Sequence, residues 1–269
     1  MIAAPSLFIS HGAPTFALEP GVTGAALAAL GQRLPTLAAV LVVSPHWITA
    51  GLEVTASAAP ATLHDFDGFP QALYALTYPA PGHPALAAEV MKLLSAAGYA
   101  VTLDGQRGLD HGAWVPLRHL LPAATTPVLQ LSIPQTLDAA GALRLGQALR
   151  PLRDRGVLVV GSGSMTHNLG EFRGAEAADE SVYVGEFVQW VRHAVTTGDT
   201  DALADYRRRA SHAVRAHPTD EHFLPLLVAV GAASAGDTIE VIEGGTLYGM
   251  LSMESYLFGQ VDASNSPAA

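Results

Sequence analysis

Short apolar runs recur along the chain, and stretches with helical spacing separate them. The runs are rich in β-branched residues and bounded by turn residues; they cover residues 6–10, 39–44, 99–103, 127–133 and 156–160. Runs that are apolar throughout are typical of strands covered on both faces. The alternation predicts an α/β fold, with a central, mostly parallel but mixed sheet flanked by helices on both faces.

The helical stretches lie between these runs and after them, at 25–33, 84–97, 115–121, 137–153, 181–197, 201–209 and 221–230. A last pair of segments, 238–243 and 246–257, predicts a C-terminal hairpin that turns at Gly244-Gly245. No internal repeat, Ser/Gly linker or low-complexity block divides the sequence, which predicts one domain over residues 1–269. The small, polar tail at 261–269 is expected to fray.

Three of the predicted strands run into turns that carry a histidine. His11 follows the first run, His46 follows the second within Ser-Pro-His-Trp, and His167 follows the last within a Gly/Ser-rich turn. Ligands bind outside the carboxyl ends of strands in open α/β sheets, so these rings are expected to converge there. A histidine after a strand can also simply cap a turn, but three such cases favour a binding edge.

Two further histidines stand beside acids. His111 lies in Asp110-His111-Gly112, where it suits proton transfer; alternatively Asp110 is a helix N-cap and His111 is exposed. His222 opens the predicted helix at 221–230, where its side chain can point from the helix end towards a metal. The alternative is a capping box with a solvated first turn, in which Thr219 or Asp220 is the N-cap.

Segment 64–82 mixes aromatics, acids, glycine and proline, and predicts a long ordered loop able to cover a site. Four aromatic side chains could form a wall around an aromatic ligand, although aromatics also serve plain packing: Trp47, Phe66, Phe69 and Tyr74. The remaining histidines on or beside helices are expected to have surface or packing roles: His83, His119, His193 and His212.

The amino-acid composition limits the kinds of metal site and nucleophile that the protein can have. With no cysteine among 269 residues, disulfides, thiolate metal sites and a cysteine nucleophile are excluded, so a bound metal must use histidine and carboxylate. Eleven histidines are available. The formal net charge of −10 argues against nucleic-acid partners and against a polybasic membrane patch. No apolar stretch is long enough to span a bilayer and no signal peptide is recognisable, so a soluble, cytoplasmic protein is expected.

Several motifs, in order from about residue 6 to 257, resemble the class III extradiol ring-cleavage dioxygenases, and more narrowly the DOPA 4,5-dioxygenase type. They are His11-Gly-Ala-Pro, Ser-Pro-His46-Trp, the segments HDFDGFPQALY at 64–74 and YPAPG at 78–82, LDHGAW at 109–114, THNL at 166–169 and HPTDEHFLPL at 217–226.

The resemblance implies a role for each matching histidine. The metal ligands of the family fall on His11, His46 and His222, and His167 is either a fourth ligand or the acid/base beside the metal. His111 matches the residue expected to bind a substrate hydroxyl or dioxygen. The wider superfamily has a carboxylate as third ligand, whereas here His222 stands in that place with Glu221 beside it. An all-histidine site also suits Zn²⁺.

The implied activity is the opening of a DOPA-like catechol ring by dioxygen to a muconic semialdehyde, with an aromatic diol and O₂ as partners. One divalent metal is expected: Fe(II) for the oxygenase, since Zn²⁺ has no redox chemistry, and Zn(II) as isolated. Two other functions stay open, a zinc hydrolase with Glu221 as base and a non-catalytic metal-binding protein on the same fold. Monomer and homodimer are both compatible with the sequence.

Overall fold

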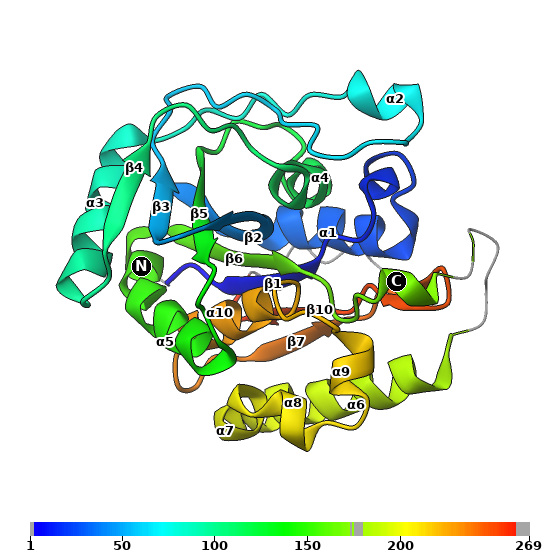
Figure 1. The fold of residues 1–269 in the computed structure, drawn as a ribbon. Coiled ribbons are helices and arrows are strands. Elements are labelled where there is room, and N and C mark those ends of the chain that lie inside the picture. Colours follow the sequence, from blue (N-terminus) through cyan, green and yellow to red (C-terminus); the bar gives the residue numbers. More distant parts are fainter. Residues whose placement is uncertain (1–2, 173, 175–179, 262–269) are drawn as a thin grey trace.

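An eight-stranded mixed sheet lies between two layers of helices in the computed structural model of the chain, which describes residues 3–172, 174 and 180–261 (Figure 1). The strand order is β4 (Val101–Asp104), β3 (Leu52–Thr55), β5 (Val128–Pro134), β2 (Ala39–Thr49), β6 (Val157–Gly163), β1 (Ser6–Ser10), β10 (Ser255–Phe258) and β7 (Ile239–Ile242). Strands β5, β2, β6 and β1 run parallel, while β3 and β10 are antiparallel to their inner neighbours. The predicted mostly parallel, mixed sheet is confirmed.

Each face of the sheet carries its own apolar core. Helices α3 (Pro84–Ala96), α5 (Ala139–Leu149), α6 (Val182–Thr197) and α10 (Leu224–Ala232) cover one face, and α1 (Gly21–Arg33) and α4 (His111–Leu120) cover the other (Figure 1). The shorter elements are η1 (Pro14–Ala17), α2 (Gln71–Tyr74), η2 (Arg150–Arg155), η3 (Leu169–Glu171), α7 (Thr200–Ala204), α8 (Tyr206–Arg209), α9 (Ala213–Ala216), β8 (Thr246–Leu247) and β9 (Leu251–Ser252).

Several predicted boundaries were wrong. The helix predicted over 137–153 changes to the 3-10 helix η2 after Leu149, because Pro151 has no N–H to continue an α-helix. The helix predicted over 201–209 divides into α7 and α8 at Asp205. The helix predicted from residue 221 begins at Leu224, with Pro225 in its first turn, so His222 precedes the helix.

The C-terminal hairpin is present, but its connection is longer than predicted. Strand β7 pairs antiparallel with β10, from Ile239 opposite Phe258 to Ile242 opposite Ser255. The small β8–β9 hairpin lies between them, so the chain does not simply turn back at Gly244-Gly245. The predicted frayed tail falls outside the described residues from position 262 onward.

Helix α10 packs against β6 at unusually short range. A Cβ added at Gly161 would lie 1.9 Å from the carbonyl oxygen of Pro225, and one at Gly163 would lie 2.3 Å from that of His222. The amide of Ser164 donates a hydrogen bond of 2.9 Å to the same His222 carbonyl. The two glycines therefore let the segment before α10 reach the carboxyl end of β6.

Helix α10 is also apolar on nearly every side, as befits a helix enclosed by protein. It is nine residues long. Across the part of the chain that the structure describes, no helix combines the length and the apolar character needed to cross a membrane.

We predict that Gly161→Ala destabilises the protein by about 1–3 kcal/mol, because the new methyl group forces α10 away from β6. Urea unfolding measures the change. Gly105→Ala is the control, since a Cβ there meets nothing within 4 Å. Equal urea midpoints for the two variants would show that the close packing of α10 does not matter for stability.

Candidate metal centre

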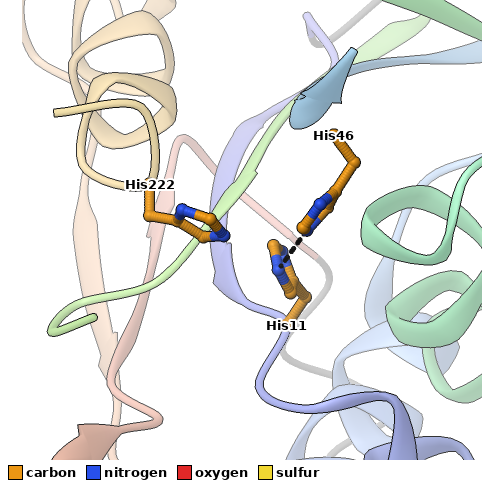
Figure 2. Close-up of side chains that lie close together, drawn as sticks. All are labelled: His11, His46 and His222. Carbon is orange, nitrogen blue, oxygen red and sulfur yellow. Dashed lines mark hydrogen bonds between the residues drawn. The ribbon is translucent and has the colours of Figure 1, made fainter. Parts of the chain in front are cut away.

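Three histidine rings converge at the carboxyl edge of the parallel strands (Figure 2). Nε2 of His11 lies 3.1 Å from Nε2 of His46, and the ring centroid of His222 is 5.7 Å from that of His11 and 5.2 Å from that of His46. One nitrogen from each ring lies within 4.8 Å of the others. The structure thus brings together the three residues that the sequence predicted as metal ligands.

His11 follows β1 directly and is held from its outer side. Its Nδ1 lies 3.0 Å from Oγ of Ser162 on the neighbouring strand β6. The Ser162 hydroxyl donates its own hydrogen to the carbonyl of Gly112, so it accepts from His11. His11 therefore carries its proton on Nδ1, and Nε2 presents a lone pair to the centre.

His46 comes from β2, where the strand is irregular. The predicted strand ended at residue 44 with a turn after it, but β2 continues to Thr49 with a shift of register against β5 between Val43 and Ile48. This irregularity places the His46 ring among the other histidines, with its centroid 3.9 Å from that of His111. The histidine thus belongs to the sheet itself.

His222 reaches the centre from the segment before α10. Its Nδ1 lies 3.2 Å from Oε1 of Glu221, which also accepts a hydrogen bond from the Thr219 hydroxyl. Its other ring nitrogen points toward His11 and His46 (Figure 2). Neither Thr219 nor Asp220 caps α10, whose N-cap position is Phe223, so the alternative of a capping box is wrong. Glu221 holds the imidazole that it precedes.

Burial keeps the three imidazoles neutral. It lowers the pKa of His11 and His222 well below the ordinary value, and neighbouring histidines lower both further. Burial, with His111 nearby, lowers the pKa of His46 to about 3. Neutral imidazole is the form that binds a metal, so no proton has to leave these rings at neutral pH.

The spacing of two of the donors fits one divalent metal. Two imidazole nitrogens bound to one ion at about 2.1 Å, with an angle between about 90° and 110°, lie roughly 3.0–3.4 Å apart. The separation of 3.1 Å between Nε2 of His11 and Nε2 of His46 falls in this range. Two further groups that could hold a metal overlap with the first: His46, Asp65 and His111, and His167, Glu221 and His222.

His167 lies flat against a predicted ligand. Its ring is stacked on that of His222, with a centroid distance of 3.6 Å and an interplanar angle of 7°. Burial lowers the pKa of His167, although Glu221 acts in the opposite direction. The turn that carries His167 is pinned by the buried His217, which donates from Nε2 to the carbonyl of Met165 at 2.9 Å.

His111 is held at the start of α4. The side chain of Asp110 caps the helix by accepting from the amide of Ala113, so the predicted N-cap is confirmed, but His111 itself is buried. Burial raises the pKa of Asp110, while a hydrogen bond from Gln130 opposes this shift. Asp65 accepts from the His111 backbone amide at 2.9 Å and lies 3.0 Å from its Nδ1.

Three of the four predicted aromatic side chains gather beside His111. Phe66 stands edge-on to the His111 ring at 5.6 Å and contacts Phe69 and Tyr74. These side chains come from the predicted long loop, in which α2 is the regular element. Trp47 lies elsewhere, with the guanidinium of Arg107 4.8 Å from its ring centre.

Sequence reasoning missed two residues that hold the histidines. Ser162 lies between two glycines at the end of β6, and its position on a strand next to β1 was the signal that could have identified it. Asp65 lies in a loop with a second acid, Asp67, and the sequence offers nothing to separate them. The structure does, because Asp67 accepts a hydrogen bond from the neighbouring amide of Gly68, whereas Asp65 lies 3.0 Å from Nδ1 of His111.

Comparison with known proteins identifies relatives whose names agree with one another. The family model described as the catalytic LigB subunit of aromatic ring-opening dioxygenase matches residues 8–259. Two proteins named 4,5-DOPA dioxygenase extradiol are each 39% identical: that of Beta vulgaris covers 94% of this chain and 96% of its own length, and that of Escherichia coli K12 covers 95% and 94%. The crystal structure of an uncharacterised protein from Escherichia coli K12 matches with a TM-score of 0.81 at 34% identity, over 95% of this chain and 100% of that one.

The fold, the histidine centre and these relatives define an extradiol aromatic ring-opening dioxygenase. The chain belongs to the LigB family of such enzymes, as its motifs predicted. Dioxygenases of this family depend on a metal, and the histidine cluster supplies a place that could bind it.

We predict that His217 makes stability depend on pH. Burial lowers its pKa to about 3 in the folded protein, whereas the unfolded ring titrates near 6.5. Between these values the unfolded chain binds the additional proton, so the free energy of unfolding falls as pH falls below about 6.5.

Metal-free wild type and His217→Gln should be compared by urea unfolding between about pH 7 and pH 5. The wild type is expected to lose up to about 1.4 kcal/mol per pH unit more than the variant. Parallel pH profiles would show that His217 is not held neutral by the fold.

Proposed function

We propose that the enzyme opens the ring of a DOPA-like catechol with dioxygen and forms a muconic semialdehyde. The observation that carries this proposal is the convergence of His11, His46 and His222, with the rings of His111 and His167 directly against two of them. The names of the relatives support DOPA or a similar catechol as the substrate.

The overall reaction is balanced without an outside reductant. The ring bond beside the diol breaks, one atom of O₂ enters the new carboxylate, and the other enters the new aldehyde. If the three histidines bind Fe(II), the ion would supply the redox chemistry that this reaction needs. Zn²⁺ has no such chemistry. The protein has to hold the diol at the centre and move its hydroxyl protons.

His111 and His167 are placed to move these protons. His111 packs against His46, and its Nδ1 is occupied by Asp65, which leaves Nε2 to accept a proton from a substrate hydroxyl. His167 suits an acid or base better than a fourth ligand. Because its ring is parallel to that of His222, the lone pairs of the two rings lie in separate parallel planes, which is poor geometry for binding one ion.

The centre has a route to solvent and an apolar side. The side chains of His46, Asp65 and Glu221 are 21%, 24% and 26% exposed. Phe66, Phe69 and Tyr74 are proposed to pack against the substrate ring near His111. Trp47, predicted for the same wall, is covered by Arg107 on one side.

The geometry gives less support to the hydrolase alternative. That function requires Glu221 as a free base, whereas its Oε1 accepts a hydrogen bond from Thr219 and lies 3.2 Å from Nδ1 of His222. A non-catalytic protein would have no use for His111 and His167 beside the ligand set. The relatives are named as dioxygenases.

We predict that catechol cleavage depends on which metal ion the protein carries. Protein from an overexpressing cell should carry mainly zinc or no metal, because imidazoles bind Zn²⁺ at least as well as Fe²⁺, and it should be inert. Anaerobic loading with Fe(II), followed by air and a panel of catechols, should give oxygen uptake and a yellow product. Equal rates for the zinc and iron forms would contradict the mechanism, and ester hydrolysis without catechol cleavage would favour the hydrolase.

We further predict that substitutions separate ligands from proton-transfer groups. His11→Ala should lose metal, whereas His111→Ala should keep it and lower turnover by about 10²–10⁴-fold. His167→Ala should behave as His111→Ala does. Metal content is measured by elemental analysis, and the exposed His193→Ala is the control. Loss of metal from His111→Ala would reassign that residue, and full activity of His167→Ala would remove it from catalysis.

A further inference from the structure

One carboxylate, Asp65, faces two histidines of the centre. Its Oδ1 accepts from the backbone amide of His111 at 2.9 Å, and its Oδ2 lies 3.0 Å from Nδ1 of the same residue. That Oδ2 is also 4.0 Å from Nδ1 of His46. In both rings the nitrogen nearest to Asp65 is therefore Nδ1.

The surrounding chain holds Asp65 in this position. The loop before it pairs with the segment that leads to His111, because the amide of Leu63 donates to the carbonyl of Leu109 at 2.8 Å. The indole of Trp114, on α4, donates to the carbonyl of Leu63 at 2.8 Å. Phe66, the next residue after Asp65, packs edge-on against the His111 ring. The residues on both sides of Asp65 are thus held against α4 and against the segment that leads to His111, which fixes the carboxylate beside this histidine.

A carboxylate can only accept hydrogen bonds. Burial acts to raise the pKa of Asp65, but the hydrogen bonds from His111 outweigh it and lower the pKa. An ionised Asp65 requires the hydrogen of neutral His111 to be on Nδ1, which leaves the lone pair on Nε2. No second acid competes for this nitrogen among the described contacts, since Asp110 points to Ser44 and Gln130.

We propose that Asp65 is a positioning residue, which fixes the Nδ1–H tautomer of His111 so that Nε2 is the atom that takes the substrate proton. The inference rests on the proposed ring-opening function, because it gives His111 the part of a base. Asp65 acts through His111, which it contacts at both the backbone amide and Nδ1. It sets which nitrogen of His111 can react, whereas its distance of 4.0 Å from Nδ1 of His46 is too long for a hydrogen bond.

The test compares Asp65→Asn with Asp67→Asn, a control in the same loop whose carboxylate is exposed and bonds Gly68. The side-chain amide that Asp65→Asn introduces has a donor to offer Nδ1, which moves the hydrogen of His111 to Nε2. The zinc-loaded protein is diamagnetic, so long-range ¹H–¹⁵N spectra of its histidines report the tautomer, with the His111 signals assigned by their loss in His111→Gln.

For the iron-loaded enzyme we expect Asp65→Asn to lower kcat by about 10–100-fold, with little change in KM or metal content. Asp67→Asn should match the wild type in every measurement. A merely structural role of Asp65 would lower the amount of folded protein without changing the tautomer.

Three results would overturn the inference: an Nε2–H tautomer of His111 in the wild type, an Asp65→Asn enzyme with unchanged kcat, or loss of metal as its main defect. The wild-type spectrum shows the tautomer of His111 and so tests the inference even if the Asp65→Asn variant does not fold. Failure of the wild type to open any catechol would instead refute the proposed function, and the tautomer measurement would still stand.

Discussion

The centre depends on the contact between the glycine face of β6 and the segment that leads into α10. Without side chains at Gly161 and Gly163, the carbonyls of Pro225 and His222 come within reach of the strand, and the Ser164 amide fastens His222 to its end. The other two rings are already at this edge, because β1 and β2 run parallel to β6. Close packing of a helix on a sheet therefore decides whether a third imidazole is present.

The polar groups around the rings follow one rule. A nitrogen that faces outward has an oxygen beside it: Ser162 for His11, Glu221 for His222, and Asp65 for His111. Such outer partners fix the orientation of a ring and the nitrogen that carries its hydrogen. For His11 the lone pair is therefore on Nε2, which faces His46. Burial lowers the pKa of His11 and His222, so both rings stay neutral and can bind a metal.

Much of this arrangement could be predicted from the sequence, since it follows from local pattern. Apolar runs identified the parallel strands, and histidines directly after them had to lie at one edge of the sheet. The place of His222 followed from resemblance to a family, because nothing local shows that residue 222 meets residue 11. Strand β3 was missed, since its four residues, Leu52–Thr55, alternate in polarity and lack a long apolar run. The start of α10 was misplaced because Pro225, rather than a capping side chain, sets it.

Asp65 and Ser162 escaped prediction for a different physical reason. Each of them acts by contacting the outer nitrogen of a histidine ring, and this contact depends on the distance between residues that are far apart in the sequence. Two acids in the same loop look alike in sequence, yet Asp65 meets two histidines and Asp67 meets a turn amide.

The order of the three predicted ligand histidines along the chain bears on how the enzyme is made. His11 and His46 leave the ribosome early, but His222 emerges only when most of the chain has been synthesised. Its position beside the other two depends on the close packing of the segment before α10 on β6, which itself lies between β1 and β2. A chain that has not yet reached residue 222 therefore lacks one of the three predicted ligands, and the full set requires the packed sheet.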